Sequence, residues 1–378
     1  MKLLILTCNT GQGHNSCANA LQEAAISRGM NCEVKDALAF ISDGFSKVIS
    51  KGHVWIYRHF PWLFSQGYKM AEQLKNFGTD GTVVYRLLST GVNRMAQYLE
   101  EGQYDYVLCT HVFASTILTE AMKKCSRQPV TGFVATDYTC HPSCEQSDLD
   151  LYFIPHEDLK EQFTAKNISE DKLVVAGIPV RQMFFLRQDQ GEAKRSFGIE
   201  PGNDHLLMMC GSMGCGPMEK LAEGLAENLS RDREITVVCG TNAKLQEKLA
   251  QRFAQQPRVH ILGYVKDMSV LLDSADLYMT KPGGISTSEA AAKGLPMVLV
   301  DAVAGCEEHN ANFFVGIGGA ILGKDPEELV TSCLELIQSP ARRRQMARAC
   351  RAAYPGNPAE EILDKLEEVK EQKLCAKA

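Results

Sequence analysis

The chain has 378 residues, more than one hydrophobic core usually organises, which predicts two domains of roughly 150–200 residues each. Apolar residues make up 45% and charged residues 23%, which is typical of a globular protein and excludes a disordered or collagen-like chain. The formal net charge of −6 argues against a general nucleic-acid binder, because phosphate binding needs a positive surface.

The 14 cysteines are scattered singly, and the apolar start of the chain is too short for a secretion signal. No stretch reaches the ~18 apolar residues expected of a membrane-spanning helix. These features predict a cytoplasmic protein with reduced thiols. The cluster Cys140-His141-Pro142-Ser143-Cys144 contains three zinc-ligand side chains but has no second cysteine pair nearby, so we expect no metal site.

Short apolar strands alternate with helical patterns along the whole chain. This alternation predicts parallel sheets covered on both faces, and two such sets predict an α/β protein of two doubly wound, Rossmann-like domains. In the first half the predicted strands are Lys2–Cys8, Cys32–Ala37, Tyr106–Thr110, Val130–Thr136, Leu151–Ile154 and Lys172–Ala176. In the second half they are His205–Met209, Glu234–Cys239, Val259–Leu262, Leu277–Thr280, Pro296–Val300 and Ala320–Ile321.

The first strand leads into Gly11-Gln12-Gly13-His14-Asn15-Ser16, and a helix is predicted over Cys17–Arg28, capped by Asn15 or Ser16. The glycines favour a sharp turn, but the full dinucleotide fingerprint is absent, so they are weak evidence for NAD. His14 falls at the carboxyl end of the strand, where open α/β sheets bind ligands. It either packs the turn or acts as a general base near neutral pH.

The span 41–98 carries seven basic and three acidic residues, a formal charge of +4 in an otherwise acidic chain. Its aromatic residues include both tryptophans of the chain and cluster at Trp55, Tyr57, Phe60, Trp62, Phe64 and Tyr68. Aromatic and basic side chains together suit the headgroup region of an anionic bilayer. The alternative is that these aromatics pack the first domain's core, and Trp62 after Pro61 is the one we most expect to be exposed.

The predicted domain boundary lies at Gly177–Arg181, which gives a first domain of residues 1–180 and a second of residues 181–358. The polar stretch Arg187–Lys194 suits a linker. Late in the chain, Ala341–Tyr354 is predicted as a basic helix. A final helix, within residues 359–378, is expected to pack back on the first domain.

Three polar turns follow strands of the second domain. The first, Gly211–Pro217, has three glycines before a helix that starts near Met218, which favours phosphate binding over an ordinary turn. The second runs from Lys281 through Gly284 to Glu289. Its hydroxyls Ser286 and Thr287 suit a diphosphate, while Glu289 suits ribose hydroxyls or simply complements the helix dipole. In the third, Glu307 and Asn310 either contact sugar hydroxyls or begin a solvated helix.

These motifs together resemble one family, the GT-B glycosyltransferases of the monogalactosyldiacylglycerol synthase and processive diacylglycerol glucosyltransferase group. Relatives of that group include the GlcNAc transferase of the peptidoglycan lipid precursor. The motifs in chain order are Gly11-Gln12-Gly13-His14, Gly177–Arg181, the turn at Gly211, Gly240-Thr241-Asn242, Gly263-Tyr264-Val265, Pro282-Gly283-Gly284 with Glu289, and Glu307 with Asn310. The segment Thr136-Asp137…His141-Pro142 resembles the glycolipid synthases in particular. The resemblance implies two Rossmann-like domains that face each other across a cleft.

By this resemblance His14 corresponds to the general base. Our hypothesis for Asp137 is that it acts in catalysis or orients His14 or the acceptor. The positions that hold the diphosphate are Gly211, Ser212, Gly214, Ser286 and Thr287. Asn242, Tyr264 and Val265 correspond to residues near the nucleotide, Glu289 to the ribose-binding acid, and Glu307 and Asn310 to the donor-sugar loop. Relatives commonly have Pro-Gly-Gln-Glu in that loop, whereas this chain has Ala304-Gly305-Cys306-Glu307, so the identity of the hexose stays open.

The expected reaction is inverting transfer of a hexose from UDP-glucose or UDP-galactose to a membrane lipid such as diacylglycerol. It needs no metal or other cofactor and no nucleic acid. The enzyme is expected to bind anionic phospholipids at the inner face of the cell membrane. Two alternatives remain open, an isomerase like the UDP-GlcNAc 2-epimerases and a non-catalytic nucleotide-sugar sensor.

Overall fold

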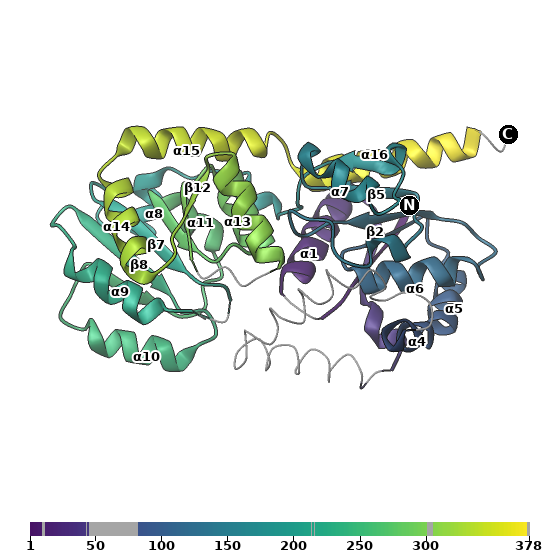
Figure 1. The fold of residues 1–378 in the computed structure, drawn as a ribbon, viewed down its shortest axis with the longest axis horizontal. Coiled ribbons are helices and arrows are strands. Elements are labelled where there is room, and N and C mark those ends of the chain that lie inside the picture. The colour runs from purple at the N-terminus through teal and green to yellow at the C-terminus, as the bar shows by residue number, and fades with distance from the viewer. Residues whose placement is uncertain are drawn as a thin grey trace. The chain divides into compact units, whose positions relative to one another are not determined.

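A computed structural model describes residues 1–9, 12–42, 44, 82–212, 214, 216–300 and 305–375. The chain divides into two units, each built on a six-stranded sheet of its own (Figure 1). The first unit comprises Met1–Gln182, Ala304–Cys306 and Gly356–Ala378. The second comprises Met183–Val303 and Glu307–Pro355.

The first sheet has the strand order β2-β1-β3-β4-β5-β6, and every neighbouring pair is parallel. Its strands are β1 (Lys2–Thr7), β2 (Asn31–Asp36), β3 (Tyr106–Cys109), β4 (Val130–Val134), β5 (Leu151–Ile154) and β6 (Leu173–Val175). Its helices are α1 (Gln12–Ser27), α4 (Val83–Ser89), α5 (Val92–Gly102), α6 (Val112–Met122), α7 (Lys160–Thr164) and α16 (Pro358–Cys375). The central strands β3, β4 and β5 are buried throughout, as the continuous apolar runs predict.

The start of α1 differs from the prediction, because the helix begins at Gln12 and not at Cys17. Asn15, predicted as a cap, lies inside the helix, and its side chain forms hydrogen bonds with residues that precede the helix. Its amide oxygen accepts from the Thr7 hydroxyl at 3.0 Å, and its amide nitrogen donates to Asn9 at 2.9 Å. These contacts replace the backbone capping that the residue type favours at a helix start.

The C-terminal helix α16 contacts α1 and β4 in the first unit, and Figure 1 shows it beside α1. Its apolar face, with Ile362, Leu363 and Leu366, is buried. Arg28, the residue after α1, donates to Glu360 at 2.7 Å and pairs with Asp364 at 2.7 Å. Residues separated by more than 300 positions therefore form one packed layer.

The second sheet has the order β12-β11-β10-β7-β8-β9, again with all pairs parallel. Its strands are β7 (Asp204–Met209), β8 (Arg233–Val238), β9 (Val259–Leu262), β10 (Leu277–Thr280), β11 (Met297–Leu299) and β12 (Ala320–Leu322). Its helices are α8 (Gln190–Ser196), α9 (Met218–Glu227), α10 (Ala243–Arg252), α11 (Met268–Ser274), α12 (Gly284–Lys293), α13 (Cys306–Gly316), α14 (Pro326–Ile337) and α15 (Pro340–Ala353). All twelve predicted strands are present, so the prediction of two doubly wound sheets is confirmed.

One predicted linker is wrong in part, because Arg187–Lys194 runs into helix α8. Asp189 caps this helix by accepting from the N–H of Glu192 at 3.0 Å. Lys194 is then buried, and its ammonium group pairs with Asp276 at 2.9 Å. The polar residues that suggested a linker therefore include the cap of a helix, Asp189, and one partner of a buried ion pair, Lys194.

Each sheet has one topological switch point, where the chain leaves two neighbouring strands in opposite directions. In the first sheet this point lies between β1 and β3, and in the second between β7 and β10. The loops that follow such strands diverge, so ligands bind between them at the carboxyl edge of the sheet. His14, in the first turn of α1, and Thr110 follow β1 and β3, and the Gly211 and Gly284 turns follow β7 and β10.

Candidate functional site

His14 is held at the first switch point by groups from two neighbouring strand ends. Its Nδ1 lies 2.7 Å from the carbonyl oxygen of Thr110, just after β3. The Thr110 hydroxyl donates to the backbone carbonyl of His14 at 3.2 Å. Thr136, beyond β4, places its hydroxyl oxygen 3.1 Å from the same Nδ1. The orientation of the imidazole ring is therefore fixed through one nitrogen.

These contacts decide which nitrogen of His14 carries the proton. A carbonyl oxygen only accepts hydrogen bonds, so Nδ1 is the donor. In the neutral ring, Nε2 then has the lone pair and is the basic atom. The Thr110 carbonyl does here what a carboxylate does in a His–Asp pair, but adds no net charge beside the ring.

His111 lies next to His14 and His141 lies next to His111, and sequence reasoning gave neither of them a role in this site. The ring centroid of His111 is 4.6 Å from that of His14 and 6.5 Å from that of His141. His111 also caps α6, because its Nδ1 accepts from the N–H of Phe113 at 3.0 Å. Burial lowers the pKa of His141, which favours its neutral form. His111 could have been found from the sequence, since it follows a predicted strand closely, as His14 does.

Asp137 directly follows Thr136 on the loop after β4 and is half-buried. Further along this loop, Cys140 and Cys144 are buried, and their thiols are free of disulfides. Among the residues that the structure describes, no three His, Cys, Asp or Glu side chains are grouped so that they could hold a metal ion.

The glycine turn after β7 is locked to the neighbouring loop after β8. Gly214 has φ +55° and Gly240 has φ +57°, and a Cβ on either would lie 2.4 Å or less from a backbone oxygen of the other loop. The N–H of Thr241 donates to the Ser212 carbonyl at 2.9 Å, which closes the contact. Gly211, with φ +70°, has no atom within 4 Å of its added Cβ. Of these three glycines, Gly211 is thus the one with room for a ligand.

Asn242 joins the same lock from the start of α10. Its side-chain oxygen accepts from the N–H of Leu245 at 3.1 Å, and its amide nitrogen donates to the Gly214 carbonyl at 3.2 Å. Asn242 therefore holds the turn in shape. Tyr264, in the loop after β9, has a side chain that is 74% exposed, and Val265 beside it is half-buried.

In the second turn, the backbone of α12 is the group available to an anion. The hydroxyls of Ser286 and Thr287 donate to the Gly283 carbonyl at 3.2 and 2.9 Å, and Thr287 is fully buried. The first N–H groups of a helix, here from Gly284 onward, have no acceptor within the helix and carry its positive end. The two hydroxyls stabilise the turn, and its N–H groups suit a diphosphate.

A buried hydrogen-bond chain supports the same turn from the end of α15. The hydroxyl of Tyr354 donates to Ser288 at 2.5 Å, and Ser288 donates to the Gly284 carbonyl at 2.6 Å. Tyr354 is the C-cap residue of α15, one residue before the second unit ends at Pro355. The last turn of α15 thus positions the first residue of α12.

Asn310 of α13 is completely buried, and its amide nitrogen donates to the Pro282 carbonyl at 3.0 Å. This contact ties α13 to the turn that precedes α12. Glu289 on α12 and Glu307 on α13 are both half-buried. Residues 301–304 lie outside the described residues. They include Ala304, where relatives commonly have the proline of the donor-sugar loop.

Comparison with known proteins connects these two sites to a family. Residues 14–180 match the family Monogalactosyldiacylglycerol (MGDG) synthase, and residues 218–353 match Glycosyl transferases group 1. The chain is 29% identical over 370 residues to the Processive diacylglycerol beta-glucosyltransferase of Bacillus subtilis (strain 168), covering 96% of this chain and 94% of that protein. A protein of the same name from Bacillus pumilus (strain SAFR-032) is 28% identical over 374 residues, covering 97% and 94%. The chain is a glycosyltransferase whose residues 14–180 form a monogalactosyldiacylglycerol synthase domain.

Solved structures show that this glycosyltransferase has the GT-B fold. MurG of Acinetobacter baumannii matches with a TM-score of 0.67 at 14% identity, covering 97% of this chain and 99% of that one. The UDP-GlcNAc 2-epimerase of Neisseria meningitidis matches with a TM-score of 0.63 at 14% identity, covering 97% and 100%. The epimerase likeness is one of fold alone, whereas the full-length sequence relatives given above are transferases.

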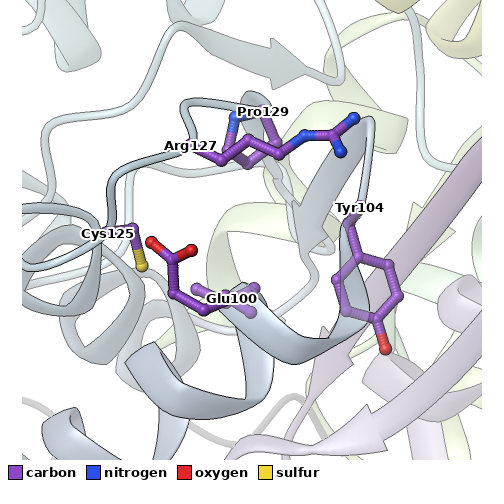
Figure 2. Close-up of a pocket in the computed structure, with 6 residues that line it drawn as sticks. Glu100, Tyr104, Cys125, Arg127 and Pro129 are labelled. Carbon is purple, nitrogen blue, oxygen red and sulfur yellow. The ribbon is translucent and has the colours of Figure 1, made fainter.

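The cavity in Figure 2 lies away from the switch points of this glycosyltransferase. It is lined by residues that include Tyr104 and Pro129, which precede β3 and β4, so it opens at the amino edge of the first sheet. Its volume of about 10 Å³ holds about one water molecule. Figure 2 shows the Glu100 carboxylate beside the Cys125 sulfur, and burial together with that carboxylate raises the pKa of the thiol. A nucleotide-sized ligand does not fit there.

Most of the basic aromatic span predicted to meet a membrane, including Trp55 and Trp62, falls in residues 45–81, outside the described part of the glycosyltransferase. Helices α4 and α5, at the end of that span, are described. Among the helices that the structure does describe, none is both long and apolar enough to cross a bilayer.

Proposed function

We propose that the protein transfers a hexose from a UDP-sugar to the hydroxyl of a membrane lipid such as diacylglycerol, with inversion at the anomeric carbon. The observation that carries this proposal is His14, whose Nδ1 is bound by the Thr110 carbonyl so that Nε2 is the basic atom. The curated relatives named above, which act on diacylglycerol by their names, support the lipid acceptor.

In the proposed reaction, Nε2 of His14 takes the proton of the lipid hydroxyl as its oxygen attacks the anomeric carbon. The bond between that carbon and the UDP oxygen breaks, and UDP leaves with the electron pair. Charge on the imidazolium is stabilised at Nδ1, because the Thr110 carbonyl and Thr136 hydroxyl both present oxygen to its N–H. We assign Asp137 a role in orienting His14 or the acceptor.

The leaving diphosphate is proposed to bind the two turns at the second switch point. The Gly211, Ser212 and Gly214 loop and the first turn of α12 offer backbone N–H groups and a helix N-terminus, which stabilise a developing negative charge without a metal. Gly284, Ser286, Thr287 and Asn242 keep these turns in shape. Glu289 is proposed to bind the ribose, Tyr264 and Val265 the base, and Glu307 and Asn310 the donor-sugar loop.

The donor is proposed to be UDP-glucose or UDP-galactose, because the relatives are named for glucosyl transfer and the matched family for galactosyl transfer. The acceptor places the enzyme at the inner face of the cell membrane, where anionic phospholipids attract basic residues. The excess of positive charge over residues 41–98 supports this location.

The direct test incubates the full chain with each UDP-sugar over diacylglycerol vesicles and identifies the lipid product by mass. We expect a glycosylated diacylglycerol with at least one donor and UDP as the second product. His14→Ala should lower the turnover by at least 1000-fold and leave UDP binding within about twofold, since the base and the donor turns lie in different units. His156→Ala, which alters another histidine of the first unit, is the matched control. Full activity of His14→Ala would refute the base assignment.

The same incubation without lipid tests the isomerase, and UDP-sugar binding measured beside the lipid assays tests the sensor. Conversion of the UDP-sugar to an epimer would favour an isomerase. Binding of UDP-sugar with no turnover on any lipid would favour a sensor.

A further inference from the structure

Helix α15 has an unusual charge for this chain. It contains five arginines and no acidic residue, whereas the whole protein has a formal charge of −6. Arg342, Arg343 and Arg344 lie near its N-terminus, where positive charge opposes the helix dipole and lowers helix stability. The stability of α15 as a helix therefore does not account for these three arginines.

One of the five arginines has a structural role. Arg343 is buried, pairs with Asp204 at 2.9 Å, and donates to the carbonyl oxygens of Leu336 and Ile337 at the end of α14. It thus satisfies the C-terminal carbonyl groups of the preceding helix. Among the described residues, no ion pair of this kind accounts for the exposed Arg344, Arg348 and Arg351.

Arg344, Arg348 and Arg351 form an arginine stripe along α15. Their spacing places them within an arc of about 60° on the helix, and all three are exposed. The opposite face of α15 packs Met346 and Cys350 into the unit. Within the described part of the chain, none of the three forms an ion pair with an acidic side chain. The stripe thus presents three charges to solvent along one line.

An exposed apolar residue lies near the C-terminal end of the stripe. The backbone at Gly294, which ends α12, lies against the side chain of Arg351. The preceding residue, Lys293, donates to the carbonyl of Leu186, whose side chain is 61% exposed. Leu186, followed by the exposed Arg187, is therefore joined through the Lys293 side chain to the end of α12 on which Arg351 packs. Apolar side chains among basic ones suit the boundary between headgroups and acyl chains.

We propose that the arginine stripe binds the surface of an anionic phospholipid bilayer and gives the second unit its own membrane contact. This inference rests on the proposed function, because a lipid acceptor brings the enzyme to such a surface. A bilayer fits the stripe better than a nucleic acid does. The stripe has no aromatic side chain on which bases could stack, and Leu186 beside it suits acyl chains.

The test is a flotation assay of the full chain with phosphatidylglycerol–phosphatidylcholine vesicles and with vesicles of phosphatidylcholine alone. A basic residue near an anionic surface contributes about fivefold to partitioning at low salt, so the Arg344→Gln/Arg348→Gln/Arg351→Gln variant should bind about 100-fold more weakly. The corresponding triple Lys variant keeps the charge and should bind within about threefold of wild type. Lys248→Gln/Arg252→Gln on α10, whose charges are already paired with Glu219 and Glu223, is the matched control and should bind like wild type.

Equal binding of wild type to both kinds of vesicle, or equal binding of the triple Gln variant and wild type, would overturn the inference. So would tighter binding of wild type to an RNA homopolymer than to the anionic vesicles. Transfer to diacylglycerol in neutral detergent micelles separates this result from the proposed function. In micelles the triple Gln variant should transfer sugar at the rate of wild type. If wild type itself transfers no sugar in micelles, the proposed function is refuted. The vesicle-binding result can still be interpreted, because it does not depend on transfer.

Discussion

At the scale of single residues, the hydroxyl of Thr136 is the part of the His14 anchor that can be removed without altering the backbone. Thr136→Val keeps the shape of the side chain and leaves the Thr110 carbonyl as the partner of Nδ1. We expect kcat to fall about tenfold, because one hydrogen bond to the charged ring is worth about 1–2 kcal/mol. UDP binding, measured by calorimetry, should not change.

Thr139→Val is the control for Thr136→Val, since Thr139 lies on the same loop but donates to Gln162. An unchanged kcat in Thr136→Val, or a loss of UDP binding, would show that Thr136 does not act through His14.

The Tyr354 hydroxyl gives a second residue-scale prediction. Tyr354→Phe removes the 2.5 Å hydrogen bond to Ser288, and the turn before α12 loses one support. We expect the Kd for UDP to rise about threefold to tenfold, from the loss of about 1 kcal/mol. Ser288→Ala should raise the Kd by a similar factor. The double variant should bind UDP no more weakly than the worse of the two single variants, because both substitutions break the same hydrogen-bond chain. Additive losses would contradict a shared chain.

At the scale of elements, the lock between the loops after β7 and β8 predicts different outcomes for two glycines. Gly240→Ala places a Cβ 2.2 Å from the Ser212 carbonyl, so the loops must separate, and we expect the second unit to lose at least 2 kcal/mol of unfolding free energy. In Gly211→Ala the added Cβ has no atom within 4 Å, so the unfolding free energy should fall only by the backbone strain, about 1 kcal/mol. Urea unfolding of the second unit measures both. Equal losses would mean that packing between the loops does not decide stability.

The elements themselves were largely predictable. Every strand was located to within two residues. For the buried central strands the signal was a continuous apolar run, because burial on both faces leaves little choice of residue type. The start of α1 and the helix α8 were mispredicted because side chains there bond to distant partners, Asn15 to Thr7 and Lys194 to Asp276. A local pattern carries no information on such pairs.

The same limit applies to the site. The rule that ligands bind at the carboxyl edge selected His14 and both glycine turns. Which side chains point inward was not predictable, since Asn310 meets Pro282, 28 positions away, and Tyr354 meets Ser288, 66 positions away. Thr110 acts partly through its backbone carbonyl, for which residue type gives no signal.

At the scale of the whole molecule, His205 predicts how stability depends on pH. Burial lowers the pKa of this side chain to about 4, and its ring bonds to Thr236 at 2.8 Å and to Ser274 at 3.1 Å. In the unfolded chain the pKa is about 6.5. Between these values the unfolded chain binds a proton that the folded chain does not, so the unfolding free energy falls as the pH is lowered. Above pH ~6.5 the stabilisation is complete, and its full loss is about 3 kcal/mol.

The measurement compares the unfolding transition of the second unit between pH 7.5 and 4 in wild type and His205→Gln. The variant should lose less stability over this range, because glutamine does not titrate. Parallel curves for the two proteins would contradict the role of His205.

The attachment of α16 to the first unit has a consequence for how the protein is made. Lys370 and Lys373 near the end of this helix pair with Asp105 at 2.9 Å and Asp150 at 2.6 Å, just before β3 and β5. A nascent chain that has grown to Pro355 already contains every residue of the second unit, but the first unit still lacks α16. The unit translated first is therefore the last to be completed on the ribosome. A chain that stops short of α16 would carry complete donor turns and an unfinished His14 site, and could hold nucleotide without passing on its sugar.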